Sequence, residues 1–351
     1  MQARIQILYL GEALWKHPSH RPYIDRKIAG GGWQPETVYL RPEDDPGLMN
    51  LLSSGDDAPL LVFADADGSA RIAELLAQTN EANPPGEKVR IYNIKGKNIT
   101  VIQTSPGEPL PPLPLKKVPH RTFHSFPEEN VSAKHLQKQS GQTRFDCVEI
   151  LPGWLRFDAY GPQAASAWAD LSDVYKYRSI PGNSLVESLI HYLASIEKKI
   201  TFAESCTGGL IAATFTAEPG ASEILEGSYV TYANRIKAGW LGVREETLRE
   251  FGAVSRECVL EMAAGAQRNL DADIAIAVSG IAGPTGAVPG KPVGTVWVCL
   301  RNGESARTER LQLHGDRNAV QEQTVLFALK FLVESEKEKI FEFFSKKPLT
   351  E

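Results

Sequence analysis

The stretch Ala203-Glu204-Ser205-Cys206-Thr207-Gly208-Gly209 brings together hydroxyl, thiol and carboxyl side chains that could take part in covalent or acid–base chemistry. A β-rich run at 200–202 precedes it and an alanine-rich apolar segment at 210–215 follows it, which predicts a strand, a tight turn and a helix. The first turn of a helix has backbone N–H groups without intrahelical acceptors, so this junction offers a nucleophile, an anion cradle, or both. A serine or threonine at this position can equally be only an N-cap.

Further blocks follow this stretch in a fixed order: Tyr229-Val230-Thr231-Tyr232-Ala233-Asn234-Arg235-Ile236-Lys237, Leu241-Gly242-Val243, Gly252-Ala253-Val254-Ser255, Val278-Ser279-Gly280-Ile281-Ala282-Gly283-Pro284, Lys291-Pro292-Val293-Gly294-Thr295-Val296 and Gly315-Asp316-Arg317. Together these blocks resemble the C-terminal domain of the CinA family, and the likeness runs from about Leu185 to Leu332. The resemblance implies a three-layer α/β/α domain with a mixed sheet. It also implies hydrolysis of the carboxamide of nicotinamide mononucleotide to nicotinate mononucleotide and ammonia, with no metal or organic cofactor.

Amide hydrolysis needs a nucleophile, a base, an oxyanion stabiliser and a proton donor for the leaving ammonia. The terminal region contains only two histidines, His191 and His314, without metal-ligand spacing around them, so a serine–lysine arrangement remains. We expect Ser205 to be the nucleophile and Lys237 the base, with the lysine pKa lowered by its surroundings. The resemblance places these roles on the same two positions and adds Tyr232, which would relay the proton or orient the lysine.

Each of these assignments has an alternative. Cys206 could be the nucleophile instead, because a thiolate at a helix start is activated, although a cysteine amidase would normally also use a histidine. Lys237 could be an ordinary surface lysine on a short helix. Glu204 could orient the catalytic groups, or it could be a solvated residue at the end of the strand.

The substrate-binding residues are expected at turns and helix starts. Thr207, Gly208 and Gly209 are candidates for an oxyanion or phosphate nest, because glycine lets the backbone approach a ligand closely. Ser222 could supply a second hydroxyl at the pocket, or it could cap a helix.

A second group of candidates follows an apolar strand, where open α/β sheets bind their ligands. It comprises Ser279, Gly280 and Gly283, and the CinA family usually has threonine where Ser279 stands, so the hydroxyl is retained. Arg317 could bind a phosphate bidentately, or it could pair with Asp316 at the start of a helix.

The terminal domain is expected at 183–345. Its hydrophobic patterns predict strands at 199–203, 227–232, 273–279, 293–300 and 306–313, and helices near 185–194, 207–217, 255–269 and 317–345. The last helix ends in an apolar patch that we expect to dock onto this or a neighbouring subunit: Ile340, Phe341, Phe343 and Phe344.

Residues 1–110 alternate strand and helix patterns, which predicts a parallel α/β layer. They resemble, more weakly, the molybdopterin-binding-like amino-terminal domain of CinA proteins through Leu10-Gly11-Glu12-Ala13-Leu14 and Ser105-Pro106-Gly107-Glu108-Pro109. The glycine-rich turn of that family is replaced by Ala64-Asp65-Ala66-Asp67-Gly68-Ser69, whose acids would repel a pyrophosphate. We therefore expect a divergent domain without pyrophosphatase activity. Asp65 and Asp67 could hold a divalent metal, but a solvated turn is the preferred interpretation.

The strand and helix patterns of residues 111–178 predict a small α+β module after the proline-rich stretch 106–119. A hairpin is expected around Pro152-Gly153 and a helix from Ala164 to Leu171. By family analogy this module is KH-like. It lacks a Gly-x-x-Gly loop, so RNA binding is not expected.

The whole chain has 351 residues, 42% of them hydrophobic and 23% charged, with a formal net charge of −5, which suits two or three globular domains. No apolar run reaches the length of a membrane helix, and the amino terminus has the pattern of a strand rather than a signal peptide. The sequence has no basic stripe with interleaved aromatic residues, so it does not predict nucleic-acid binding. Four widely spaced cysteines without a CxxC pair favour a reducing cytoplasm.

We therefore predict a cytoplasmic homodimeric enzyme that acts on a small nucleotide, without a nucleic-acid or membrane partner. Two alternatives remain at this stage. The chain could be an inactive nucleotide-sensing or scaffold protein, against which the presence of Ser205, Tyr232 and Lys237 argues. It could also be an ADP-ribose pyrophosphatase through its amino-terminal domain, against which the missing glycine turn argues.

Overall fold

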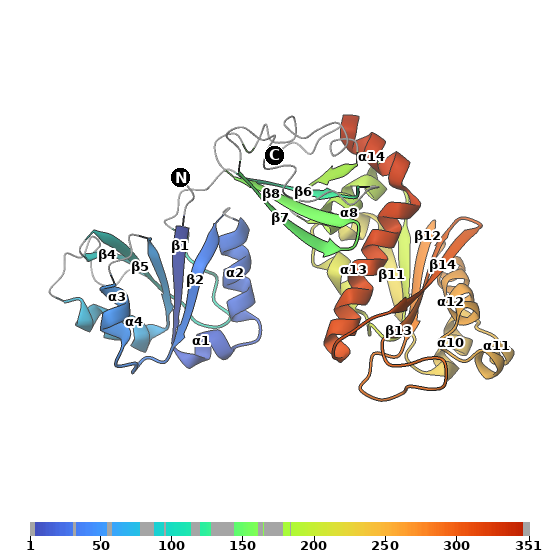
Figure 1. Cartoon of the computed structure of the whole chain (residues 1–351), viewed down its shortest axis with the longest axis horizontal. Coiled ribbons are helices and arrows are strands. Elements are labelled where there is room, and N and C mark those ends of the chain that lie inside the picture. The colour runs from blue at the N-terminus through green and yellow to red at the C-terminus, as the bar shows by residue number, and fades with distance from the viewer. Residues whose placement is uncertain are drawn as a thin grey trace. The chain divides into compact units, whose positions relative to one another are not determined.

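The computed structural model describes residues 4–30, 33–54, 58–77, 88–94, 96–113, 120–127, 144–160, 164, 178–182 and 184–346. The chain forms two compact units, which are described separately (Figure 1). The first comprises Met1–His120 with Tyr160–Ala165, and the second comprises Arg121–Ala159 with Ser166–Glu351.

The first unit contains β1 (Arg4–Leu10), β2 (Gln34–Arg41), β3 (Leu60–Ala64), β4 (Val89–Ile94) and β5 (Lys97–Gln103), with α1 (Glu12–Lys16), α2 (His20–Gly30), α3 (Leu48–Leu52) and α4 (Ala66–Leu75). The strand order is β2-β1-β3-β5-β4, and only the edge strand β4 is antiparallel to its neighbour. Alternate side chains of β1 face opposite sides of the sheet, where Ile7 packs with α2 and Leu8 packs with α3 and α4. The predicted α/β layer is confirmed, whereas α1, α2 and α3 were not predicted.

The two acids that replace the glycine-rich turn lie at the start of α4. Asp65 is the N-cap, and its carboxylate accepts a hydrogen bond from the Gly68 backbone N–H at 2.9 Å. Asp67 lies in the first helical turn, where a negative charge is favourable. The turn therefore has a structural role as a helix cap. Within the described residues, no group of three or more His, Cys, Asp or Glu side chains is placed to hold a metal ion.

The second unit begins with a four-stranded sheet in the order β7-β8-β6-β9. Its strands are β6 (His120–Ser125), β7 (Arg144–Leu151), β8 (Trp154–Tyr160) and β9 (Ser179–Pro181). The hairpin predicted around Pro152-Gly153 is confirmed by the adjacent strands β7 and β8. The predicted helix from Ala164 to Leu171 lies outside the described residues except for Ala164.

This small sheet shares a hydrophobic core with the terminal region. Phe126, Trp154 and Ile180 belong to the same buried cluster as Leu189 and Phe202 of the terminal region. The strand β9 lies beyond residue 178, at which we expected the small module to end, and it pairs with β6. The strands of the small module and the terminal region are therefore parts of one compact unit.

The terminal region is built on a mixed five-stranded sheet in the order β11-β10-β12-β13-β14. Its strands are β10 (Ile200–Glu204), β11 (Leu225–Val230), β12 (Ile274–Gly280), β13 (Thr295–Asn302) and β14 (Ser305–Gln312). β10 is parallel to both β11 and β12, whereas β13 and β14 complete the sheet as antiparallel strands. All five predicted strands are present, with ends shifted by one or two residues.

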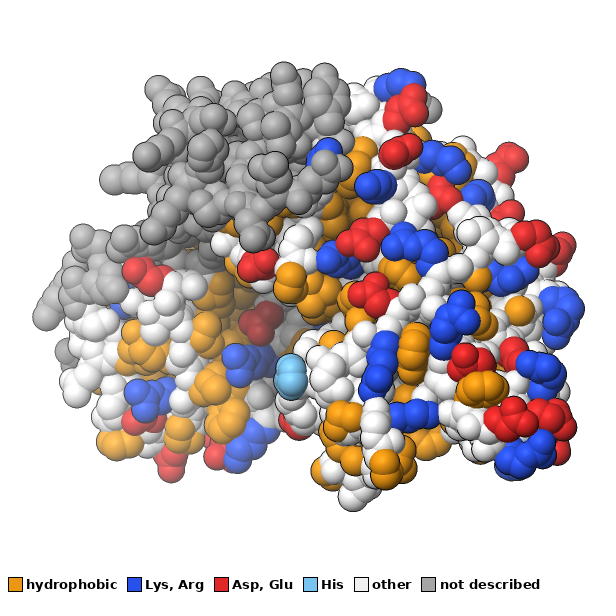
Figure 2. Space-filling view, turned by 45° about the vertical axis from the view of Figure 1, so that its right-hand side comes forward, with side chains coloured by type: hydrophobic (Ala, Val, Ile, Leu, Met, Phe, Trp, Pro, Cys, Tyr) orange, Lys and Arg blue, Asp and Glu red, His pale blue; other side chains and the backbone are white. Residues whose placement is uncertain are grey.

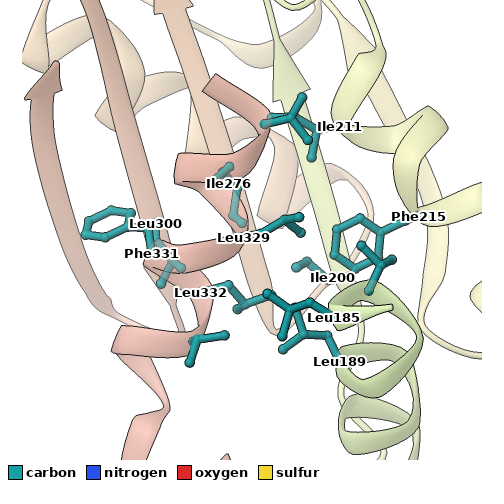
Figure 3. Packing of buried hydrophobic residues seen from close by; sticks show 14 of the residues in the cluster. Leu185, Leu189, Ile200, Ile211, Phe215, Ile276, Leu300, Leu329, Phe331 and Leu332 are labelled. Carbon is teal, nitrogen blue, oxygen red and sulfur yellow. The ribbon is translucent and has the colours of Figure 1, made fainter. Parts of the chain in front are cut away.

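Helices cover both faces of this sheet, as predicted for a three-layer α/β/α domain. The helices are α8 (Leu185–Ser195), α9 (Leu210–Thr216), α10 (Asn234–Leu241), α11 (Glu245–Glu250), α12 (Arg256–Asn269), α13 (Arg317–Ser335) and α14 (Lys337–Lys346). Side chains from α8, α9 and α13 pack with Ile200 and Ile276 of the sheet on one face (Figure 3). On the other face the small residues Ala203, Ala275 and Ala277 pack against α10 and α12.

The predicted helix 317–345 is two helices, α13 and α14, which are separated at Glu336. The buried Glu336 carboxylate accepts hydrogen bonds from the Tyr192 hydroxyl and the Asn302 amide, which fixes the break between the helices. Beyond it, Ile340 and Phe344 are fully buried in the core of their own unit, so the terminal apolar patch docks onto this subunit. No helix in the described part of the chain has both the length and the hydropathy to cross a membrane.

On the face drawn in Figure 2, lysine and arginine side chains are interspersed with aspartate and glutamate over the right-hand part of the molecule. The described residues on this face thus form a mixed surface rather than a continuous basic stripe.

A glycine in α12 sets the position of α10. A Cβ at Gly265 would lie 1.9 Å from the Leu241 carbonyl oxygen, which is far inside van der Waals contact. We expect Gly265→Ala to lower the free energy of unfolding by about 3 kcal/mol, because α10 and α12 must separate. Chemical denaturation measures this change. Gly239→Ala in α10, where an added Cβ meets nothing within 4 Å, is the matched control and should not destabilise the protein; equal stability of the two variants would contradict the close contact.

Candidate active site

The parallel strands β10, β11 and β12 bring the predicted catalytic blocks to one edge of the sheet. Parallel strands have their carboxyl ends at the same edge, where α/β proteins bind ligands. Ser205 follows β10 directly, and its backbone N–H donates to the Val278 carbonyl of β12 at 3.1 Å. Thr231 follows β11, and its N–H donates to the Glu204 carbonyl at 2.8 Å. The turn after β10 and the segment leading to α10 are thereby held together.

The side chains of Ser205 and Lys237 are in direct contact. Lys237 Nζ lies 2.9 Å from Ser205 Oγ, although 32 residues separate them in the sequence. Ser205 is 8% exposed and Lys237 is 1% exposed. The alternative of a surface lysine is therefore wrong: α10 turns Lys237 into the protein, beneath the nucleophile candidate.

The other contacts of Lys237 are two backbone carbonyls. The Thr231 oxygen lies 2.6 Å and the Tyr232 oxygen 3.3 Å from Nζ. No ion pair within the described residues includes Lys237, and burial lowers the pKa of its ammonium group. An ammonium group would donate to all three oxygens, whereas a neutral amine would donate to the two carbonyls and keep one lone pair. The lone pair then faces Ser205 Oγ.

The Cys206 thiol, next to the serine, is poorly suited to act as the nucleophile. Cys206 is 4% exposed and belongs to the buried hydrophobic cluster beneath the turn. Burial raises the pKa of this thiol to about 12, so the reactive thiolate is scarce at neutral pH. The geometry therefore favours Ser205 over Cys206 as the nucleophile.

Cys206→Ala should accordingly retain at least about half of the wild-type kcat, because a buried thiol contributes packing rather than chemistry. The measurement is the initial rate of substrate hydrolysis, together with the melting temperature. Alkylation by iodoacetamide at pH 8 provides a second check, since the folded protein should react much more slowly at Cys206 than the unfolded chain. An inactive but folded Cys206→Ala variant would reverse the assignment.

The Glu204 side chain forms hydrogen bonds with the start of α9. Its side chain is fully buried and lies at the start of α9, so it is not a solvated strand-end residue. Its carboxylate accepts hydrogen bonds from the Thr207 hydroxyl at 2.6 Å and from three backbone N–H groups, those of Gly209, Ile211 and Ala212. Gly209, with φ of 100°, takes the left-handed conformation that begins this helix.

These bonds alter the nest predicted from Thr207, Gly208 and Gly209. The Thr207 hydroxyl and the Gly209 N–H are both committed to Glu204, and the Gly208 N–H donates to the Ser205 carbonyl at 3.2 Å. The backbone N–H groups of Cys206 and Thr207 contact the Cys206 thiol. The Thr207 hydroxyl and the two glycine N–H groups of the predicted nest are therefore already bonded within the protein.

The end of β12 places Ser279, Gly280 and Gly283 at the same edge of the sheet. The Ser279 hydroxyl is buried and donates to the Ala253 carbonyl at 2.7 Å, so it fixes a neighbouring loop. A Cβ at Gly280 would lie 2.6 Å from Val296 Cγ2, so glycine is required for the close approach of β13.

Arg317, at the start of α13, contacts two different segments at this edge of the sheet. Its guanidinium donates to the Gly283 carbonyl and to the Tyr232 hydroxyl, each at 2.7 Å. The predicted alternative of an Arg317–Asp316 pair is wrong, because Asp316 instead caps α13 by accepting from the Ala319 N–H at 2.9 Å. Guanidinium has five N–H donors, so two contacts fix its orientation and leave three for a ligand.

The Tyr232 side chain is 62% exposed, and its hydroxyl contacts Arg317 rather than Lys237. It is the backbone carbonyl of Tyr232 that helps to orient the lysine. The expected proton relay through the phenol is thus not formed in this structure, whereas the expected orientation of Lys237 is.

Ser222 is the one candidate that lies far from the others. It is an exposed residue in the short 3₁₀ helix Ala221–Glu223, which leads into the start of β11. Beside it, the Ile224 backbone carbonyl accepts a hydrogen bond from the Ile200 N–H, at the beginning of β10. Ser205 follows the other end of β10, about 16 Å away at the usual strand rise. Ser222 is therefore at the opposite edge of the sheet and does not reach the site; it does not cap the 3₁₀ helix either, because Gly220 does.

Comparisons with known proteins bear on the same region. A family model described as the CinA C-terminal domain matches residues 182–335. A CinA-like protein of Thermotoga neapolitana is 33% identical over 278 residues, which cover 73% of this chain and 68% of that protein. A protein named nicotinamide-nucleotide amidohydrolase PncC, of Pseudomonas putida, is 47% identical over 154 residues, which cover 44% of this chain and 96% of that protein.

Another relative matches over a smaller share of its length. A CinA-like protein of Thermosipho melanesiensis is 47% identical over 137 residues, so the match spans 38% of this chain and 34% of that relative. The crystal structure of the competence damage-inducible protein A of Klebsiella pneumoniae covers 43% of this chain and 93% of its own, with 39% identity and a TM-score of 0.42.

Proposed function

The chain belongs to the CinA family, and we propose that its terminal region is a nicotinamide-nucleotide amidase that converts nicotinamide mononucleotide and water to nicotinate mononucleotide and ammonia. The name of the Pseudomonas putida relative, at 47% identity, supports this substrate. The observation that carries the proposal is the buried Lys237 amine, which lies 2.9 Å from Ser205 Oγ and whose other partners in the described part of the chain are two carbonyl oxygens.

In the first step Ser205 Oγ attacks the carboxamide carbon while Lys237 accepts the hydroxyl proton. Burial favours this step, because it lowers the pKa of Lys237 and so disfavours the ammonium form. The tetrahedral intermediate carries a negative oxygen, and the backbone N–H groups of Cys206 and Thr207, which follow Ser205 in the turn, are our proposed donors to it in place of the Cys206 sulfur. Lys237 then returns the proton to the leaving nitrogen, the C–N bond breaks and ammonia departs.

The second step hydrolyses the ester formed on Ser205. A water molecule attacks the acyl carbon, and Lys237 accepts its proton as the C–O bond forms. The intermediate collapses, Ser205 Oγ leaves and takes the proton back, and nicotinate mononucleotide is released. Neither step requires a metal ion, so a chelator should not reduce turnover.

Arg317 is our proposed contact for the substrate phosphate. Its guanidinium is already oriented by Gly283 and Tyr232, and three of its N–H donors remain for phosphate oxygens. The start of α9 is a less suitable phosphate site, since Glu204 already occupies its amides. The nicotinamide mononucleotide would then lie between Arg317 and Ser205, along the edge of the sheet.

The test is incubation of the full-length protein with nicotinamide mononucleotide, with and without a chelator, followed by measurement of ammonia and nicotinate mononucleotide. Equal amounts of both products are expected. Binding of the nucleotide without product, measured by calorimetry, would instead identify an inactive nucleotide-sensing protein. Activity that is lost with chelator and restored by a divalent metal would contradict the serine–lysine scheme.

A further inference from the structure

One buried carboxyl group at the site, that of Glu204, takes no part in the proposed reaction. Glu204 is fully buried, and none of the ion pairs in the described residues includes it. Its Oε2 accepts from Thr207 Oγ1, Gly209 N and Ile211 N at 2.6, 3.1 and 3.0 Å, and its Oε1 accepts from Ala212 N at 2.9 Å. These four donors match the acceptor capacity of the two carboxyl oxygens.

We propose that Glu204 is a positioning residue for the Ser205–Lys237 pair, an internal anion that holds the nucleophile turn against the start of α9. The inference rests on the proposed function in taking Ser205 as the nucleophile. Without this carboxylate, the amides of Gly209, Ile211 and Ala212 would lack acceptors at a site shielded from water, which is unfavourable. The turn would then rearrange to satisfy them.

The same residue also holds the lysine side of the pair. The Glu204 backbone carbonyl accepts from the Thr231 N–H at 2.8 Å, and the Thr231 carbonyl accepts from Lys237 Nζ at 2.6 Å. The side chain of Glu204 thus fixes the residues after Ser205, while its backbone fixes the segment that orients Lys237. A shift at residue 204 therefore changes the distance between the two catalytic groups from both sides.

Glu204→Gln keeps the size of the side chain and exchanges one acceptor oxygen for an NH₂ donor. At least one of the four donors then faces another donor, so the turn must move. Glu336→Gln is the matched control, because Glu336 is also a buried carboxylate that accepts from Tyr192 and Asn302, but at the break between α13 and α14. Both variants lose a buried carboxylate, but only Glu204 lies at the candidate active site.

The experiment compares crystal structures of the wild type and the two variants with the rate at which a fluorophosphonate probe labels Ser205. In Glu204→Gln the Ser205 Oγ–Lys237 Nζ separation should exceed about 3.5 Å, and labelling should slow by about 10²-fold. The kcat for nicotinamide mononucleotide should fall by a similar factor with little change in KM, since Arg317 is untouched. Glu336→Gln should keep the 2.9 Å contact and the wild-type labelling rate.

An unchanged Ser205–Lys237 contact in Glu204→Gln, or equal labelling rates in the two variants, would overturn the inference. If Glu204→Gln does not fold, Thr207→Val removes one of the four donors and should produce a smaller change in the same direction. A wild-type protein that the probe does not label would argue against Ser205 as the nucleophile, whereas the distance in the variant structures would still decide the role of Glu204.

Discussion

Lys237→Met is expected to lower kcat by about 10³-fold, because it removes the base that contacts Ser205 Oγ. Methionine is close to lysine in length and suits the buried site, so the variant should fold. It leaves the Thr231 and Tyr232 carbonyls without their donor, which should cost about 1–3 kcal/mol of unfolding free energy. Ammonia release measures kcat, and thermal unfolding measures the loss of stability.

The matched control is Lys237→Arg, which keeps a cation but cannot act as a base, because guanidinium does not lose its proton in proteins. This variant should be as inactive as Lys237→Met. An active Lys237→Arg variant would show that the positive charge, and not the lone pair, is what the reaction uses.

The pH profile follows from the same residue. Burial lowers the pKa of Lys237, and only the neutral amine can accept the Ser205 proton, so kcat/KM should rise with pH through a midpoint below 10.5. The unfolded chain keeps the lysine proton to higher pH than the folded protein does. Burial of Lys237 therefore costs stability in full below its folded pKa, and this cost is relieved as pH rises toward the unfolded value.

Ser205→Ala is expected to lower kcat by about 10³-fold or more, because it removes the atom that forms the bond to the substrate. The change deletes one partly buried hydroxyl, and binding of the nucleotide should persist because Arg317 is unchanged. The rate of ammonia release and the Kd from calorimetry separate the two effects. Retention of more than a tenth of wild-type activity would mean that another group, such as a lysine-activated water, attacks the amide.

The elements of the terminal region could be predicted because their hydrophobic patterns are strong. The strands β10, β12 and β13 are mostly apolar, and α12 begins one residue after its predicted start and ends at the predicted residue. The break at Glu336 could not be predicted, because the sequence remains helical on both sides and the cause is a tertiary contact with Tyr192 and Asn302. The short helices α1 and α3 were missed because five residues carry too little periodicity.

The pairing of Ser205 with Lys237 was predicted, but the contacts that support it were not. Ser205 and Lys237 lie in motifs with an identifiable chemistry, whereas Thr231 takes part through its backbone carbonyl, for which side-chain type gives no signal. Glu204 was ambiguous because a carboxylate at a strand end is usually solvated, and only the arrangement of α9 over the strand buries it. Ser222 was misplaced because its distance from the site depends on which end of β10 it adjoins.

The most direct test of the account is mass spectrometry of the protein quenched during turnover of nicotinamide mononucleotide. The account predicts an ester of nicotinate mononucleotide on the peptide that contains Ser205, and its absence from the Ser205→Ala variant. Peptide fragmentation distinguishes Ser205 from the adjacent Cys206. An adduct on Cys206, or a first turnover that releases ammonia without any adduct on Ser205, would contradict the serine–lysine mechanism.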